Sequence, residues 1–237
     1  MKNIIALCIG FYCLISFSLA QKKSADLSDK IGFKQYNGDW SFTAINQNII
    51  KVTFQPKQNS TNENISDAVL LKPLSNPHFM HSIVSKNDTI TIGTNNPLRI
   101  AYFENKDGYK GFSLRLNEQE KIFGGGERAL PLNRRGYQFN LYNNPWYGYG
   151  IGADNLNYSV PFFTSSNGYG LYFDNPSKGL ADIGKTNANF LNVAFVSGEL
   201  TMYLIIGKKY PEILQSYHQL TGTQPLPPRW ALGNLMS

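Results

Sequence analysis

The stretch IKVTF, residues 50–54, decides the fold class, because apolar and polar side chains alternate along it. The runs TITI at 89–92 and SLRL at 113–116 repeat this pattern. A period of two places one face of a segment on a core and the other in solvent, which is typical of antiparallel strands. Residues from about 30 to 206 are therefore predicted to form a large antiparallel β-sandwich, within a domain spanning residues 21–207.

One helix interrupts the β pattern, in the segment YPEILQSYHQLTG at 210–222. Pro211 suits the first helical position, where its missing N–H would have no partner in any case. Gly222 provides a left-handed stop. Apolar residues share one helical face at Ile213, Leu214, Tyr217 and Leu220. We expect residues 208–224 to be a connector helix and linker between two domains.

The last segment, PLPPRWALGNLMS at 225–237, combines three prolines with an apolar run. Proline cannot join a regular helix or a central strand, so the prolines indicate a stiff, extended linker. The run from Trp230 to Gly233 then predicts a strand buried on both faces, which requires neighbouring strands. We therefore expect residues 225–237 to begin a second domain, with the chain stopping just inside it.

The first twenty residues are typical of an export signal, because Lys2 precedes an apolar run that ends in small residues at Ala20. A cleaved signal peptide over residues 1–20 is predicted. The alternative is a membrane anchor, for which the run is short against the ~20 residues of a span. Both cysteines, Cys8 and Cys13, fall in this segment, so no disulfide or thiolate chemistry is expected afterwards. The expected location is secreted or periplasmic.

The charge pattern bears on the class of partner. The chain has 22 Lys and Arg against 16 Asp and Glu, a formal net charge of +6, and the basic residues are scattered. A nucleic-acid binder would carry a basic stripe or patch, so no nucleic-acid partner is expected. An outer-membrane barrel would need repeated alternating segments of about ten residues, which the helix and prolines interrupt. No membrane partner is expected either.

Two short motifs are candidate ligand sites. The glycines of FGGGER at 123–128 match neither phosphate-binding spacing, and Glu127 would oppose a phosphate. A close approach of two backbones, or a bulge at a sheet edge, is favoured there. His78 and His81 lie close together, but no third ligand accompanies them. The prediction is therefore no metal and no cofactor.

The richest candidate site is the stretch at 132–163, which is long and rich in glycine, asparagine and tyrosine. Long ordered loops in compact domains are usually functional. Sugars need directed hydrogen bonds for their hydroxyls and flat aromatic faces for their C–H groups. The predicted substrate-binding residues are Asn143, Asn144, Trp146 and Tyr147, with Tyr149 beside them. The alternative is that these aromatic residues only close one end of the sandwich.

No catalytic residue is predicted in this chain. Hydrolysis of a glycoside requires two carboxyl groups that flank the scissile bond. Glu127, Asp154 and Asp174 are available, yet none lies in a recognisable catalytic setting. Asp174 precedes Asn175-Pro176, where a turn-capping role is simpler.

Three blocks carry a resemblance to a known family. They are FGGGERALPLNRRG at 123–136, SVPFFTSSNGYGLYFDNPSKG at 159–179 and YPEILQSYHQLTGTQPLPPRWALG at 210–233. In order and spacing they resemble the amino-terminal half of glycoside hydrolase family 31, which contains α-glucosidases, α-xylosidases and transglucosylases. The resemblance implies a galactose-mutarotase-like β-sandwich followed by a (β/α)8 barrel that begins at Arg229. It also implies a retaining mechanism whose two aspartates would lie on barrel strands beyond Ser237.

The resemblance also bears on specificity. A sandwich loop walls the sugar pocket in this family, and it corresponds to Tyr142-Asn143-Asn144. Many α-glucosidases have W-N-x-D there, whereas this chain has a neutral amide in place of the carboxylate. The segments ERALPLNRRG at 127–136 and YNNPWYGY at 142–149 resemble the 4-α-glucosyltransferase branch of the family. We expect the amino-terminal part of an enzyme that hydrolyses or transfers α-glucosyl units, with α-linked oligosaccharide and its own barrel as partners. A free-standing carbohydrate-binding sandwich is the alternative.

Overall fold

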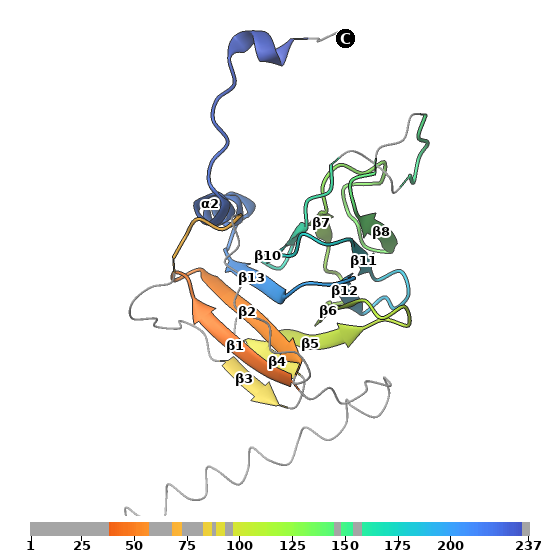
Figure 1. Cartoon of the computed structure of the whole chain (residues 1–237), viewed down its shortest axis with the longest axis vertical. Helices are drawn as coiled ribbons and strands as arrows, with labels where there is room; N and C mark the ends of the chain where they lie inside the picture. Colours follow the sequence, from red (N-terminus) through yellow and green to blue (C-terminus); the bar gives the residue numbers. More distant parts are fainter. Residues whose placement is uncertain are drawn as a thin grey trace, which may run out of the picture. The chain divides into compact units, whose positions relative to one another are not determined.

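The computed structural model describes residues 38–56, 68–72, 83–86, 89–92, 97–144, 148–153 and 158–233. Within these ranges the chain forms two antiparallel sheets, a helix and a short 3₁₀ helix (Figure 1). The predicted signal peptide at 1–20 lies outside the described residues. None of the helices in the described part is long and apolar enough to cross a membrane.

Sheet A contains six strands in the order β1-β2-β13-β10-β9-β7, and sheet B contains seven in the order β3-β4-β5-β6-β12-β11-β8. The strands of sheet A are β1 (Gly38–Ala44), β2 (Ile49–Pro56), β7 (Ile122–Gly124), β9 (Phe162–Ser165), β10 (Tyr169–Phe173) and β13 (Leu200–Ile206). Those of sheet B are β3 (Ile83–Lys86), β4 (Thr89–Ile92), β5 (Leu98–Glu104), β6 (Lys110–Arg115), β8 (Tyr137–Leu141), β11 (Gly179–Ile183) and β12 (Phe190–Phe195). The predicted antiparallel sandwich is confirmed.

The main core lies between the two sheets and is strongly aromatic. Its largest fully buried side chains include Phe54, Phe112, Phe139, Phe163 and Phe173. The rings of Phe163 and Phe173 meet edge to face with their centroids 6.1 Å apart. Offset and edge-to-face pairs of this kind add to the stabilisation from apolar burial. Much of the aromatic content of the sequence is therefore explained by packing.

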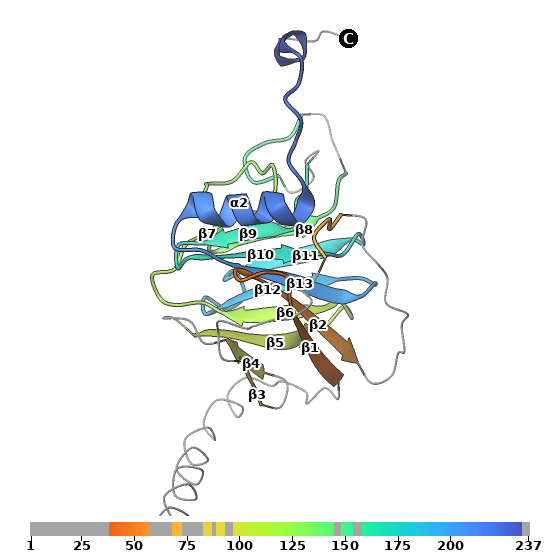
Figure 2. The same ribbon diagram turned by 90° about the vertical axis from the view of Figure 1, so that its left-hand side faces the viewer.

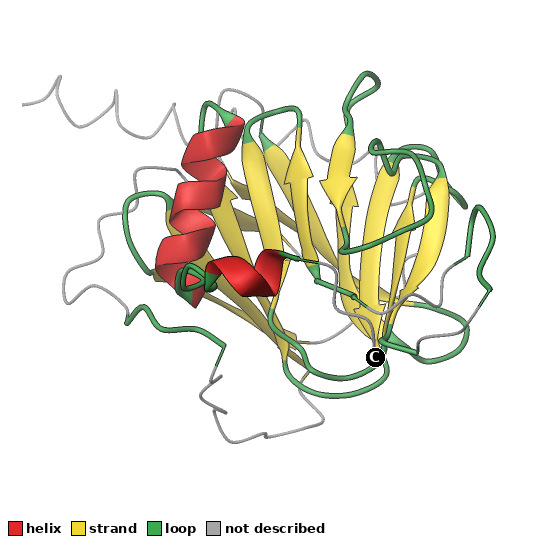
Figure 3. Cartoon of the chain, turned by 90° about the horizontal axis from the view of Figure 1, so that it is seen from above, coloured by secondary structure: helices red, strands yellow, loops and turns green. Residues whose placement is uncertain are grey.

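The helix α2 (Tyr210–Thr221) forms where the sequence predicts it, and it covers part of the outer face of sheet A (Figures 2 and 3). Ile213 and Leu220 are buried in a second cluster with residues of β9, β10 and β13. The ring of Tyr217 stacks on Phe162 at a centroid distance of 4.0 Å. Gly222 ends the helix with a positive φ of 91°, and its N–H donates to the carbonyl oxygen of His218.

This helix changes one expectation about the strands. Strict alternation predicts that one face of each strand lies in solvent, yet every residue of β10 is buried. In β13 only Ile206 is not fully buried. The reason is that both faces of these strands are covered, one by sheet B and one by α2. Strands buried on two faces read as continuous apolar runs, even in an antiparallel sheet.

The expectation of a strand from Trp230 to Gly233 is wrong for the described structure. Residues Arg229–Leu232 form a 3₁₀ helix, in which the N–H of Ala231 donates to the carbonyl oxygen of Pro228 at 2.9 Å. The side chains of Trp230 and Leu232 are 72% and 71% exposed. An extended segment needs a neighbouring strand for its backbone groups, and no described strand pairs with this one. Hydrogen bonds within the 3₁₀ helix pair these backbone groups instead.

Candidate functional site

Three consecutive glycines bring two segments together at the edge of sheet A. Gly124, Gly125 and Gly126 all have positive φ, and Gly124 is the last residue of the edge strand β7. A Cβ on Gly126 would lie 2.2 Å from the carbonyl oxygen of Tyr158. The next N–H, from Glu127, donates to that same oxygen at 2.8 Å. Of the two predicted alternatives, the close approach of two backbones is confirmed.

Arg128 fixes the geometry beyond the glycines. Its guanidinium lies 4.7 Å from the centre of the Phe139 ring, and the residue is 8% exposed. One terminal nitrogen donates to the carbonyl oxygen of Asn140 at 2.9 Å and to the hydroxyl of Ser159 at 2.8 Å. The other donates to its neighbour, the carbonyl oxygen of Glu127. One buried cation therefore joins the glycine loop, β8 and the segment that leads into β9.

Arg134 shapes the same loop from the other side. Its Nε donates to the carbonyl oxygen of Gly124, and Nη1 donates to those of Leu130 and Pro131 at 2.7 Å. Burial lowers the pKa of this guanidinium from its ordinary value. Charged donors on carbonyl oxygens make stronger hydrogen bonds than neutral ones. The course of residues 124–131 is therefore set by two arginines, a role that the sequence analysis missed.

The loop between β8 and β9 carries the predicted substrate-binding residues. Asn143 Oδ1 accepts a hydrogen bond of 2.6 Å from the N–H of Ser159, which closes the base of the loop. The side chains of Asn143 and Asn144 are exposed. Trp146 and Tyr147 lie outside the described residues. The assignment of these four residues to sugar binding stays a prediction.

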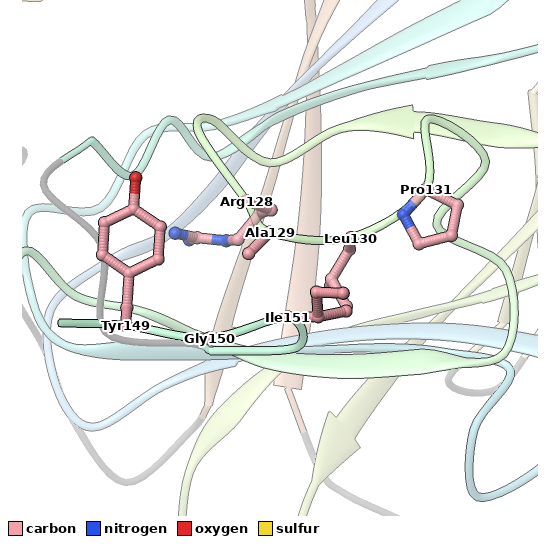
Figure 4. A pocket seen from close by; sticks show the side chains of 7 residues that line it. All are labelled: Arg128, Ala129, Leu130, Pro131, Tyr149, Gly150 and Ile151. Carbon is pink, nitrogen blue, oxygen red and sulfur yellow. The ribbon is translucent and has the colours of Figure 1, made fainter.

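A hollow of about 620 Å³ lies between this loop and the loop of Arg128 (Figure 4). Its lining residues are Arg128, Ala129, Leu130, Pro131, Tyr149, Gly150 and Ile151. The two loops are joined where the N–H of Gly152 donates to the carbonyl oxygen of Ala129 at 2.8 Å. Tyr149 is 52% exposed and Ile151 is fully exposed. In Figure 4 the guanidinium of Arg128 extends toward the side of the hollow where Tyr149 stands.

The hollow combines apolar, aromatic and charged groups. It presents an aromatic ring with a hydroxyl at Tyr149, apolar walls at Leu130 and Ile151, and a guanidinium behind them. Neither Asn143 nor Asn144 lines it. The sequence offered one signal for it, since Tyr149 stands in the aromatic loop already singled out. Nothing in the sequence indicated that residues 128–131 form the opposite wall.

The carboxylates of the described residues do not converge on the hollow, because none is among its lining residues. At the turn after β10 the capping oxygen belongs to Asn175, whose Oδ1 accepts bonds from the N–H and hydroxyl of Ser177. The sequence predicts a turn-capping role for Asp174, and the capping hydrogen bonds seen here come from the next residue, Asn175. Asp154 and the histidines at 78 and 81 lie outside the described residues.

One buried carboxylate, Glu120, has a structural explanation. It accepts hydrogen bonds from the hydroxyls of Ser165 and Tyr169 and from the N–H of Asn117. Burial, reinforced by the nearby charge of Glu120, raises the pKa of Tyr169 well above its ordinary value. In the described part of the chain no three His, Cys, Asp or Glu side chains are grouped as metal ligands would be.

Comparison with known proteins identifies the fold and the family. Residues 34–182 match the glycosyl hydrolase 31 N-terminal galactose mutarotase-like domain. An α-xylosidase of Emericella nidulans is 31% identical over 156 residues, which cover 66% of this chain and 19% of that enzyme. Alpha-glucosidase 2 of Bacillus thermoamyloliquefaciens is 27% identical over 213 residues, covering 79% and 27% of the two chains.

A solved structure extends the comparison to three dimensions. The GH31 dextranase of Flavobacterium johnsoniae, complexed with glucose, superposes with a TM-score of 0.65 at 26% identity, covering 84% of this chain and 30% of that one. The chain therefore spans less than a third of the length of each of these relatives. Its mostly β architecture with one short helix is the galactose-mutarotase-like sandwich. This chain belongs to glycoside hydrolase family 31, whose amino-terminal sandwich it contains.

Proposed function

We propose that this chain supplies the amino-terminal, non-catalytic part of a retaining family 31 enzyme that acts on α-glucosides, by hydrolysis or by 4-α-glucosyl transfer. The single observation that carries the proposal is the match of residues 34–182 to the glycosyl hydrolase 31 N-terminal domain. The hollow between the Arg128 loop and the Tyr149 loop offers a place where the sandwich could meet a sugar. The family match supports glycoside chemistry for the whole protein. The relatives are an α-xylosidase, an α-glucosidase and a dextranase, which supports an α-linked substrate.

In this proposal the sandwich walls the sugar pocket and does not react. Tyr149 offers a face for the C–H side of a sugar ring, and Asn143, Asn144, Trp146 and Tyr147 contribute hydrogen bonds and further aromatic surface. A retaining glycosidase needs two carboxyls about 5–5.5 Å apart across the scissile bond. No residue that lines the hollow carries one. The two reacting aspartates are assigned to a (β/α)8 barrel.

Apolar side chains that face solvent support such a partner module. Leu226 is 93% exposed, and Trp230 and Leu232 are exposed as well. Leu132 is 81% exposed beside the loop of the candidate site. Large exposed apolar side chains close together in the chain, as at Leu226, Trp230 and Leu232, are typical of interaction surfaces. We assign these side chains to contact with the barrel.

We also propose that the protein is secreted or periplasmic.

The test compares the 237-residue chain with the polypeptide encoded by its natural reading frame. Both are assayed on a chromogenic α-glucoside after purification from a host without glycosidases. The 237-residue chain is expected to release nothing above the blank, and the natural product to release the chromophore with retention at the anomeric carbon. Turnover by the 237-residue chain itself would refute the non-catalytic role.

A free-standing carbohydrate-binding module is the second candidate. The observation in its favour is that sheet A buries its outer face under α2, a helix of the same chain. This second candidate predicts a stop codon directly after Ser237 and oligosaccharide binding by the chain alone. An open frame that continues into a barrel sequence would exclude it.

A further inference from the structure

The wall of the hollow that carries Tyr149 joins the sandwich through two stems. The first stem follows β8 and includes Asn143, and the second leads into β9 and includes Ser159. Asn143 Oδ1 accepts a hydrogen bond of 2.6 Å from the N–H of Ser159, although 16 positions along the chain separate the two residues. The two stems are therefore tied to each other at Ser159.

The hydroxyl of Ser159 ties the second stem to the opposite wall of the hollow. Its oxygen accepts a hydrogen bond of 2.8 Å from Nη2 of Arg128, which lines that wall and is 8% exposed. The same nitrogen donates to the carbonyl oxygen of Asn140 on β8. Hydrogen bonds from a charged donor are stronger than those between neutral groups. One serine therefore bonds to the other stem through its N–H and to the facing wall through its hydroxyl.

Other contacts fix the far end of the second stem. Three residues after Ser159, the ring of Phe162 stacks on Tyr217 of α2 with a centroid distance of 4.0 Å. The carbonyl oxygen of Phe162 accepts the N–H of Gly125 at 3.0 Å. Val160 packs into the cluster under the helix. Loss of the Ser159 hydroxyl should therefore affect the hollow and leave β9 and α2 in place.

Two backbone hydrogen bonds also join the walls, and one of them can report on their separation. The N–H of Glu127 donates to the carbonyl oxygen of Tyr158, and the N–H of Gly152 donates to that of Ala129, both at 2.8 Å. Gly152 is exposed, so water reaches its N–H as soon as the walls part. The rate of amide exchange at Gly152 therefore measures how often the hollow opens.

We propose that Ser159 is a positioning residue for the sugar site, which acts through Arg128 to hold the two walls of the hollow at the separation that a substrate ring requires. This inference rests on the proposed function, because it takes the hollow as part of the sugar pocket. A protein whose walls are correctly spaced for only part of the time binds its ligand with an apparent affinity reduced by that fraction. The reacting carboxyls are assigned to the barrel, so Ser159 takes no part in bond breaking. Its loss should raise KM and leave kcat unchanged.

The experiment measures kcat and KM of the natural polypeptide on a chromogenic α-glucoside. Ser159→Ala should raise KM about three- to tenfold and change kcat by less than about twofold. Ser166 provides the matched control, because it lies at the opposite end of β9 and its hydroxyl also accepts one hydrogen bond, from the N–H of Lys121 at 2.9 Å. Ser166→Ala should leave both constants unchanged.

Two further measurements separate positioning from a loss of stability. In the 237-residue chain, amide exchange at Gly152 should accelerate at least about fivefold in Ser159→Ala and stay unchanged in Ser166→Ala. In the natural polypeptide, Ser159→Ala should change KM less when Arg128→Lys is already present than it does alone, because residues that act as a unit are not additive.

The inference is overturned if Ser159→Ala keeps the KM of the parent, if kcat falls instead, if the effects at Ser159 and Arg128 simply add, or if exchange at Gly152 does not change. A natural polypeptide that turns over no α-glucoside would overturn the proposed function, and the assignment of Ser159 to a sugar site with it. The two failures are distinguishable, because only the second abolishes turnover by the parent.

Discussion

Arg128 and Phe139 form a buried cation–π pair, with the guanidinium carbon 4.7 Å from the centre of the ring. The pair holds the Gly124–Gly126 turn against β8, while hydrogen bonds from the same guanidinium reach Asn140 and Ser159. The position of the candidate site therefore depends on a residue whose side chain is mostly hidden from solvent.

Replacing Arg128 by Ala should lower the free energy of unfolding by about 2–4 kcal/mol, because buried carbonyl and hydroxyl acceptors lose a charged donor. Arg128→Lys should recover only part of this, since an ammonium lacks the planar fork. Urea titration provides the measurement. Arg115, which is exposed at the end of β6, is the control, and Arg115→Ala should stay within about 0.5 kcal/mol of the parent. Equal effects at both positions would contradict the anchoring role.

Gly126→Ala tests the close approach of the two backbones. The new Cβ would lie 2.2 Å from the carbonyl oxygen of Tyr158, at a φ of +86°. Gly108→Ala is matched to it, since φ there is +81° and no atom lies within 4 Å of the new Cβ. In the control, the free energy of unfolding should fall by only about 1–2 kcal/mol, the cost of a residue with a Cβ in the left-handed conformation. Gly126→Ala should be destabilised clearly more than Gly108→Ala in thermal unfolding. Equal destabilisation of the two variants would show that the contact with Tyr158 does not restrict residue 126.

Leu220→Ala tests whether α2 is part of the folded sandwich. The side chain is fully buried against sheet A, so its truncation should lower the free energy of unfolding by about 2–5 kcal/mol. The neighbouring Gln219 is exposed, and Gln219→Ala should have almost no effect. A single cooperative transition that shifts only in Leu220→Ala is expected. A helix that melts separately, before the sheets, would argue against this packing.

The tyrosines under α2 predict loss of stability in alkali. Burial, followed by the charges of Asp174 and Glu199, raises the pKa of Tyr203 to about 12. The unfolded chain ionises near 10, so the neutral phenol stabilises the native state fully below pH ~10. That contribution is lost as pH rises from about 10 through about 12. Urea midpoints across this range should fall less steeply in Tyr203→Phe, and parallel slopes would refute the assignment.

Asn143→Ala should loosen the loop between β8 and β9, because it removes the acceptor for the N–H of Ser159. Amide exchange at Ser159 should accelerate several-fold while global stability changes by less than about 1 kcal/mol. Asn144 is also exposed, and Asn144→Ala should leave exchange at Ser159 unchanged. If exchange at Ser159 is the same in both variants, the hydrogen bond does not hold the loop.

The sequence predicted those features that are encoded locally. The alternation at 50–54 corresponds to β2, the run at 89–92 to β4, and Pro211 and Gly222 bracket the helix. The glycine run at 124–126 indicated a close approach because only a residue without a Cβ fits such a contact. Each signal depends on neighbours in the chain, which is why pattern reasoning succeeded there.

Features that depend on distant contacts were not predictable in the same way. Arginine is usually exposed, so the burial of Arg128 and Arg134 among carbonyl oxygens followed from no local pattern. The apolar run at Trp230 predicts a strand but forms a 3₁₀ helix, because the periodicity of a short apolar run does not distinguish a strand from a helical segment.

The helix α2 has a practical consequence for how this sandwich is produced. A polypeptide cut at Gly207, where the β pattern ends, would lack the helix and uncover Phe162, Tyr172 and Tyr203 together. An aromatic sheet face of that kind favours self-association and inclusion bodies over secretion of a folded product. A polypeptide produced for study of this region should therefore extend beyond Gly222, so that α2 covers the aromatic face of sheet A.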